Sequence, residues 1–150
     1  MFQTKPDKRL PDLSAPRRFA SLMSLYERNY QLLQRIIPEP RELTGALESC
    51  SERDETLHLA VLEHTRYTSL LHLTYLIPAV DGPSAVPDLK VRLYHDARMA
   101  EVLDYQGMAP AAPGPGTLLR RWTENLLLEK WLEFIAENGH EFLQNRDLQA

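Results

Sequence analysis

The chain has 150 residues, a usual length for one domain and long enough to bury a core without disulfides or metal ions. Its hydrophobic content of 43% is ordinary for a globular protein, and its net charge of −4 argues against the broad basic surface that nucleic-acid binding needs. The single cysteine, Cys50, excludes an internal disulfide and a multi-cysteine zinc site.

The N-terminal segment has no strong pattern. Residues 1–13 combine charges and prolines with little periodicity, so we expect a flexible arm. The basic cluster from Lys5 to Arg18 predicts a solvated surface, since no aromatic side chain interrupts it as in single-strand binders. No signal peptide and no apolar run of about 18 residues is present, so we expect a cytoplasmic protein without membrane contact.

A helix over residues 16–36 is the first predicted element. Ser14 and Pro16 mark its start, because a hydroxyl caps the first turn and proline loses nothing there. Pro38 and Pro40 end it. Its apolar residues recur every three or four positions and form one face: Phe19, Leu22, Met23, Tyr26, Tyr30, Leu33 and Ile37.

Short segments with strand character follow this helix. In one of them Leu57, Leu59 and Val61 alternate with other residues, which is typical of a strand with one buried face. A proline-rich stretch at 78–88 predicts a surface loop. The predicted strands are residues 45–50, 56–63, 67–76, 89–95 and 99–106. The first and last of them are the weakest patterns, so the count is four or five strands.

The C-terminal part begins with an Ala/Pro/Gly loop at 107–116, followed by a helix that Thr117 caps and Gly139 ends. The apolar residues of this helix form two groups on opposite sides: Leu118, Leu119, Trp122 and Leu126, and Leu127, Leu128, Trp131, Phe134 and Ile135. One stripe cannot hold both groups, so the helix is either kinked or covered on two sides. The second cover is the first helix or, in a homodimer, another copy of the chain.

The order helix, four or five strands, helix predicts an α+β fold. Consecutive strands with short turns pair antiparallel, so we expect a curved antiparallel meander with both helices on one face. The predicted domain spans residues 14–139, and residues 140–150 form a tail.

Several segments resemble a known family. EHTRYTSLLHL (63–73) and VRLYHDARMAEVLDYQ (91–106) are similar to two signature stretches of the YqiB-like family of small proteobacterial proteins. NYQLLQRIIP in the first helix and WLEFIAENG near the end add to the resemblance. The family is a domain of unknown function, so the resemblance implies no particular activity.

Polar residues at the ends of the predicted strands are the candidate site. Along the fourth strand Arg92 and Tyr94 share one face and His95 lies on the other. A guanidinium beside a phenol suits recognition of a carboxylate or phosphate. The predicted ligand-binding residues are Arg66, Tyr67, Arg92, Tyr94, His95, Asp96, Arg98 and Glu101. The alternatives are a solvated face, with a salt bridge from Arg92 to Glu63 or Glu101, and a protein interface.

His95 and Asp96 also suggest an acid–base pair. Neighbouring strand residues point to opposite faces, however, which favours a turn-capping Asp96 and a half-buried His95. The leading hypothesis is therefore a non-enzymatic binding or regulatory module for a small anionic ligand or an unknown protein partner. The alternative is a small hydrolase or nucleotide-processing enzyme that uses His95 and Asp96.

No metal or cofactor is expected. His58 and His64 are predicted to share a strand face, with His72 on the next strand, but no ligand pair has the close spacing usual for zinc. The sequence contains no Gly-rich phosphate loop, no GxSxG and no HExxH motif.

Overall fold

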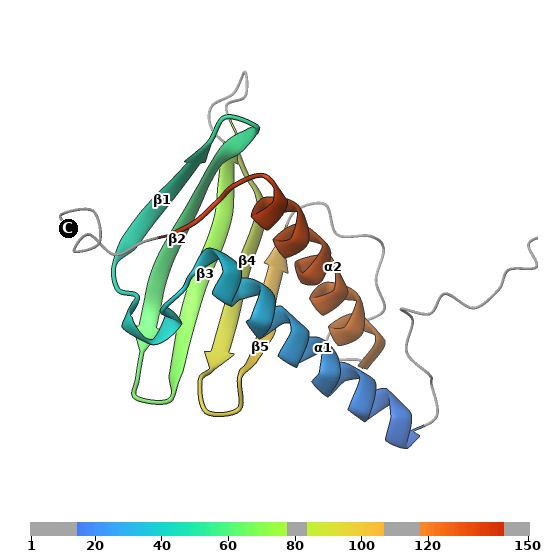
Figure 1. Cartoon of the computed structure of the whole chain (residues 1–150). Helices are drawn as coiled ribbons and strands as arrows, with labels where there is room; N and C mark the ends of the chain where they lie inside the picture. Colours follow the sequence, from blue (N-terminus) through green and yellow to red (C-terminus); the bar gives the residue numbers. More distant parts are fainter. Residues whose placement is uncertain (1–14, 78–83, 107–117, 143–150) are drawn as a thin grey trace, which may run out of the picture.

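The computed structural model describes residues 15–77, 84–106 and 118–142. One long helix precedes the five strands in the chain and a second long helix follows them, which confirms the predicted α+β fold (Figure 1). In chain order the elements are α1 (Ala15–Ile36), the short 3-10 helix η1 (Pro40–Glu42), β1 (Ala46–Ser51), β2 (Asp54–His64), β3 (Thr68–Ile77), β4 (Ser84–Tyr94), β5 (Met99–Gln106) and α2 (Leu118–Glu137).

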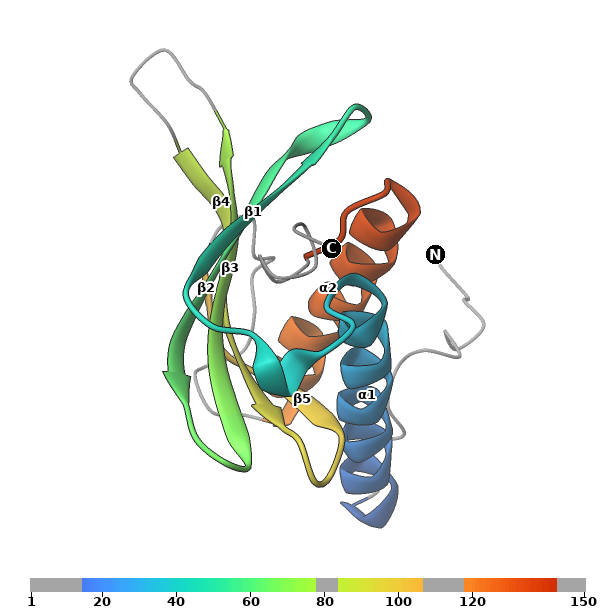
Figure 2. The same ribbon diagram turned by 60° about the vertical axis from the view of Figure 1, so that its left-hand side comes forward.

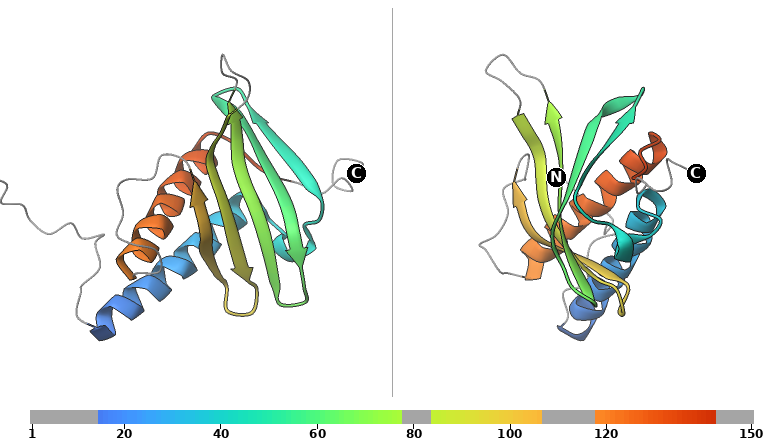
Figure 3. Two further views of the ribbon diagram at one scale, coloured as in Figure 1. Left: turned by 180° about the vertical axis from the view of Figure 1, so that it is seen from behind. Right: turned by 90° about the vertical axis from the view of Figure 1, so that its left-hand side faces the viewer.

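The five strands form one antiparallel sheet in the order β1-β2-β3-β4-β5. The sheet is strongly curved, and α1 and α2 both lie against its concave side (Figure 2). Seen from behind, none of the described helices covers the convex side (Figure 3). The fold is therefore an open two-layer arrangement with a single buried sheet face.

Strand alternation places the apolar residues on the concave face. Leu59, Leu71, Leu73 and Val91 are about 1% exposed, and each pairs with an inward residue of the neighbouring strand. These side chains meet the C-terminal half of α1 and the C-terminal half of α2 in the main core. The period of two in the sequence therefore predicts the inward positions of these four residues.

The two apolar groups of α2 are covered within one chain. Leu128, Leu132 and Ile135 are fully buried in the main core under the sheet. Trp122 packs in a second cluster against Leu22, Leu25 and Tyr26 of α1. The first helix is thus the second cover, one of the two options that the split pattern left open.

Asn125 connects α2 to both β5 and α1 through hydrogen bonds. Its side-chain oxygen accepts a hydrogen bond from the Val102 N–H of β5 at 2.9 Å, and its backbone oxygen accepts one from Asn29 Nδ2 of α1 at 3.0 Å. Arg28 adds an ion pair to Glu129 of α2 at 2.6 Å. These contacts fix how α1 lies beside β5, and hence where the pockets along α1 form.

Two boundaries differ from the sequence prediction. β4 begins at Ser84, inside the predicted loop 78–88; the β3–β4 register shifts between Thr74 and Leu76, and such an irregularity accommodates Pro87 in a strand. Beyond Gly139, where the sequence placed a tail, Phe142 is only 2% exposed. The predicted arm 1–13, the Ser14 and Thr117 caps and the loop 107–116 lie outside the described residues. No helix in the described ranges has the length and apolar character that crossing a membrane requires.

Candidate functional site

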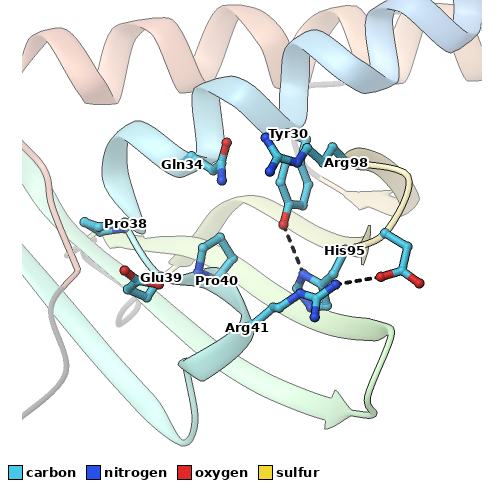
Figure 4. A pocket seen from close by; sticks show the side chains of 9 residues that line it. Tyr30, Gln34, Pro38, Glu39, Pro40, Arg41, His95 and Arg98 are labelled. Atoms are coloured by element: carbon cyan, nitrogen blue, oxygen red, sulfur yellow. Dashed lines mark hydrogen bonds and ion pairs between the residues drawn. The ribbon is translucent and has the colours of Figure 1, made fainter.

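A pocket of about 390 Å³ lies between the C-terminal half of α1, η1 and the β4–β5 turn (Figure 4). We call it the His95 pocket. It is lined by Tyr30, Gln34, Pro38, Glu39, Pro40, Arg41, His95, Asp96 and Arg98. The lining comes from three parts of the chain that only the tertiary fold brings together.

His95 forms the buried floor of the pocket. It follows the inward residues of β4 in the alternation, its N–H donates to the Tyr67 carbonyl at 2.9 Å, and it is 3% exposed. Its Nδ1 lies 3.1 Å from the Tyr30 hydroxyl and its Nε2 lies 2.9 Å from Ser69 Oγ. Burial, followed by the charges of Arg41 and His64, lowers its pKa below the usual value. The ring is therefore a neutral, fully hydrogen-bonded imidazole at neutral pH.

The hydrogen bonds of His95 continue to the end of β2. Ser69 Oγ also lies 2.9 Å from His64 Nδ1, so that Tyr30, His95, Ser69 and His64 form one chain from the pocket to an exposed histidine. A neutral imidazole has one donor and one acceptor nitrogen, so its two hydrogen bonds run in the same direction along the chain. The network orients the Tyr30 hydroxyl at the pocket.

Asp96 does not orient His95. Its carboxylate accepts a hydrogen bond from Arg41 at 2.6 Å, and both side chains are more than half exposed. The two ring nitrogens of His95 are already bonded to Tyr30 and Ser69. The geometry therefore contains no His95–Asp96 hydrogen bond of the kind that an acid–base pair needs.

Arg98 stands in an unusual backbone conformation. It is the last residue of the β4–β5 turn and has φ of 55°, in the left-handed region where glycine or asparagine is usual. Its guanidinium makes no ion pair with any residue of the described ranges. Burial raises the pKa of the Tyr30 phenol, and the nearby charges of Arg41 and Arg98 partly offset that rise.

The other predicted site residues lie elsewhere. Arg66 stacks over the Tyr67 ring at 5.3 Å in the β2–β3 turn. Arg92 pairs with Glu63 at 3.4 Å on the convex side, the salt bridge weighed in the sequence analysis. Tyr94 donates to Glu101 at 2.8 Å and both face a different pocket. The structure thus brings His95, Asp96 and Arg98 together and separates the remaining five from them.

Sequence reasoning missed six residues that line the pocket: Tyr30, Gln34, Pro38, Glu39, Pro40 and Arg41. Tyr30 was assigned to the apolar face of the first helix, yet its hydroxyl was a signal, since a buried phenol needs a hydrogen-bond partner. Gln34 and Arg41 gave no such signal, because nothing in the pattern places the segment after α1 beside the β4–β5 turn.

A second buried network, also unpredicted, lies at the opposite end of the sheet. His140 Nδ1 is 2.9 Å from Ser49 Oγ, and its Nε2 is 2.9 Å from Asp54, which also accepts a hydrogen bond from Tyr75 at 2.5 Å. The residue types are those of a hydrolase triad. However, Ser49 is 5% and His140 3% exposed, and Ser49 Oγ accepts the Glu141 N–H. The network fastens the chain after α2 onto β1 and β2.

The histidines considered for zinc lie on different faces. The β2–β3 register shifts between Val61 and Glu63, and this bulge turns His64 to the side of Ser69, whereas His58 pairs with Glu48 at 3.2 Å. His58 and His64 therefore do not share a face, contrary to the prediction. His72 bonds to Asp88. Within the described residues, no three His, Cys, Asp or Glu side chains are grouped as metal ligands would be.

Comparisons with known proteins agree with the resemblance seen in the sequence. The family model described as "Protein of unknown function (DUF1249)" matches residues 32–141. "Uncharacterized protein YqiB" of Escherichia coli strain K12 is 36% identical over 128 residues, which cover 81% of this chain and 90% of that protein. The protein of the same name from Escherichia coli O157:H7 gives the same figures. No solved structure gives a significant match.

Proposed function

The chain belongs to the DUF1249 family of proteins of unknown function, and we propose that it is a non-catalytic binding module for a small anionic ligand held in the His95 pocket. The volume of about 390 Å³ is in the range of small-molecule sites, about 300–1,000 Å³. The lining is mostly polar and comes from α1, η1 and the β4–β5 turn, which suits recognition of a small polar group.

The conformation of Arg98 is the observation that carries this proposal. A non-glycine residue in the left-handed region costs roughly 1–3 kcal/mol, and such strain persists mainly where a side chain is needed at that place. Here the strained residue is an arginine whose guanidinium lines the pocket without an ionic partner in the described part of the chain. The turn thus presents to the cavity a cation that no described residue neutralises.

Among the charged residues of the pocket, Arg98 is the main positive charge available to an anionic ligand. Arg41 already has an ionic partner in Asp96, at 2.6 Å, and the lowered pKa keeps His95 neutral at neutral pH. Glu39 also lines the pocket, on the side away from Arg98 (Figure 4), so a bound anion is expected beside Arg98. A carboxylate or a phosphate monoester would accept two parallel hydrogen bonds from Arg98 and one from Gln34 or Tyr30.

The test is anion binding by the Arg98→Gly variant, measured by calorimetry and thermal shift with inorganic phosphate, sulfate and AMP. We expect the wild-type chain to bind at least one probe and the variant to bind it about tenfold more weakly, the loss of one charge-assisted contact. Glycine tolerates the left-handed backbone, so the melting temperature of the variant should be unchanged or higher.

Arg66→Ala is the matched control, because it removes an exposed arginine from another turn. It should leave probe affinity unchanged. Absence of binding to all three probes, or an equal loss in Arg66→Ala, would contradict the proposal. The hydrolase alternative receives no support from the geometry, because His95 and Asp96 bond to different partners.

A further inference from the structure

A second pocket, of about 360 Å³, lies against the N-terminal half of α1. We call it the Tyr26 pocket. Ala97 of the β4–β5 turn lines it, whereas the neighbours Asp96 and Arg98 line the His95 pocket. Most of its wall is apolar and comes from Phe19, Leu22, Met23, Met99 and Leu118. Phe19 is 61% exposed, so an aromatic ring stands at the mouth of the pocket.

A carboxylate is built into this apolar wall. Glu101 accepts a hydrogen bond from the Tyr26 hydroxyl at 3.2 Å on one oxygen and from the Tyr94 hydroxyl at 2.8 Å on the other. Burial, and then Glu101 itself, raises the pKa of both phenols, so they remain donors at neutral pH. Each carboxylate oxygen has a further lone pair, so Glu101 is oriented by the phenols and still has capacity to accept a ligand donor.

A positive charge lies across the same pocket. Arg121 of α2 is exposed and lines the cavity, and it forms no ion pair with a residue in the described ranges. Its charge acts on the Tyr26 phenol and so reaches into the pocket. The site therefore combines one oriented carboxylate, an apolar wall and one guanidinium that has no ionic partner among the described residues.

We propose that the Tyr26 pocket binds a zwitterionic small molecule of the hydrophobic α-amino acid class. The ligand ammonium would donate to Glu101, its carboxylate would accept from Arg121, and its side chain would pack against Leu22, Met23 and Met99. A ligand with a single charge would leave one of the two protein charges unmatched. This inference does not depend on the anion site, whose residues are different.

Calorimetry on the full chain with three matched probes tests the proposal: L-phenylalanine, 2-phenylethylamine, which lacks the carboxylate, and 3-phenylpropionate, which lacks the amine. We expect L-phenylalanine to bind about tenfold more tightly than either singly charged probe, because a hydrogen bond to a charged group contributes roughly one factor of ten. Glu101→Gln should weaken the two amine-bearing probes and spare 3-phenylpropionate. Arg121→Gln should weaken the two carboxylate-bearing probes and spare 2-phenylethylamine.

Asp104→Asn is the control for charge alone, since it neutralises an exposed carboxylate on the same strand outside the Tyr26 pocket. It should change none of the affinities. Equal binding of the three probes, no binding at millimolar concentration, or an effect of Asp104→Asn as large as that of Glu101→Gln would overturn the proposal. Arg98→Gly should leave L-phenylalanine binding unchanged, which separates this outcome from that of the His95 pocket.

Discussion

His95 illustrates how its surroundings determine the chemistry of a side chain. The sequence places it next to an aspartate, yet the fold directs Asp96 to Arg41 and gives His95 a phenol and a serine hydroxyl instead. Burial then lowers the histidine pKa. A residue that resembles half of a catalytic pair becomes a neutral structural element beneath a pocket.

This lowered pKa predicts acid sensitivity. The unfolded chain binds a proton at His95 near pH 6.5, whereas the folded chain resists protonation until lower pH. The stability that neutral His95 contributes is thus present above about pH 6.5 and is lost as pH falls towards the folded pKa. The groups that set this are Tyr30, Arg41, His64, Ser69 and Asp96.

We expect the melting temperature of the wild-type chain to fall as the pH is lowered below about 6.5, and that of His95→Gln to fall less over the same interval. Glutamine retains a donor and an acceptor, so the variant should fold. His72→Gln, at a partly exposed histidine on the convex side, is the control. Identical pH profiles of His95→Gln and the wild-type chain would refute the assignment of the slope to His95.

At the scale of elements, the segment that follows α2 attaches the end of that helix to α1, β1 and β2. Phe142 is buried in the main core and its N–H donates to the Ile36 carbonyl at the end of α1 at 2.6 Å. His140 is held between Ser49 of β1 and Asp54 of β2. These contacts join β1 and β2, at the edge of the sheet far from β5, to the C-terminal ends of both helices.

His140→Ala should therefore lower the free energy of unfolding by about 1–3 kcal/mol, because Asp54 and Ser49 lose a partner in a buried site. Denaturant unfolding measures this change. His58→Ala removes a histidine from the solvated convex side and should cost no more than about 0.5 kcal/mol. Equal effects of the two substitutions would show that this attachment contributes little.

At the scale of the whole molecule, the sheet and α1 cover most of the two apolar groups of α2 without a second chain. One group enters the main core and Trp122 of the other packs on α1, while Leu119 and Phe134 remain more than 40% exposed. The split apolar pattern of α2 was the reason to predict a homodimer, and packing within one chain now explains that pattern. Leu119 and Phe134 are the most exposed apolar side chains of α2 and remain available for such a contact.

Trp122→Ala should lower stability by about 3–5 kcal/mol, the usual cost of removing a core tryptophan, without changing the elution volume in sizing chromatography. Phe134→Ser should leave stability nearly unchanged, and it would shift the elution volume only if α2 forms an interface. If Trp122→Ala shifted the elution volume with little loss of stability, the apolar group that contains Trp122 would instead form a dimer contact.

Local periodicity was sufficient to predict the two long helices and the five strands, but not the short helix η1 or the first residues of β4. The three- and four-residue spacing from Leu22 to Ile37 and the alternation along Leu57, Leu59 and Val61 depend on near neighbours in the chain, and the structure has a helix and a strand at those places. The antiparallel meander followed from the short turns between strands. Each of these is a property of a segment.

The two pockets depended on the tertiary structure. Tyr30 and His95 are 65 positions apart, Tyr26 and Glu101 are 75, and Asp54 and His140 are 86. No local pattern predicts contacts between residues so far apart in the sequence. The bulge that turns His64 to the side of Ser69 is likewise a feature of strand pairing rather than of one strand. The sequence by itself determined the two long helices, the five strands and the faces that most of these elements bury. Only packing decided which polar side chains meet, because a polar group finds its partner after the apolar faces have placed the elements.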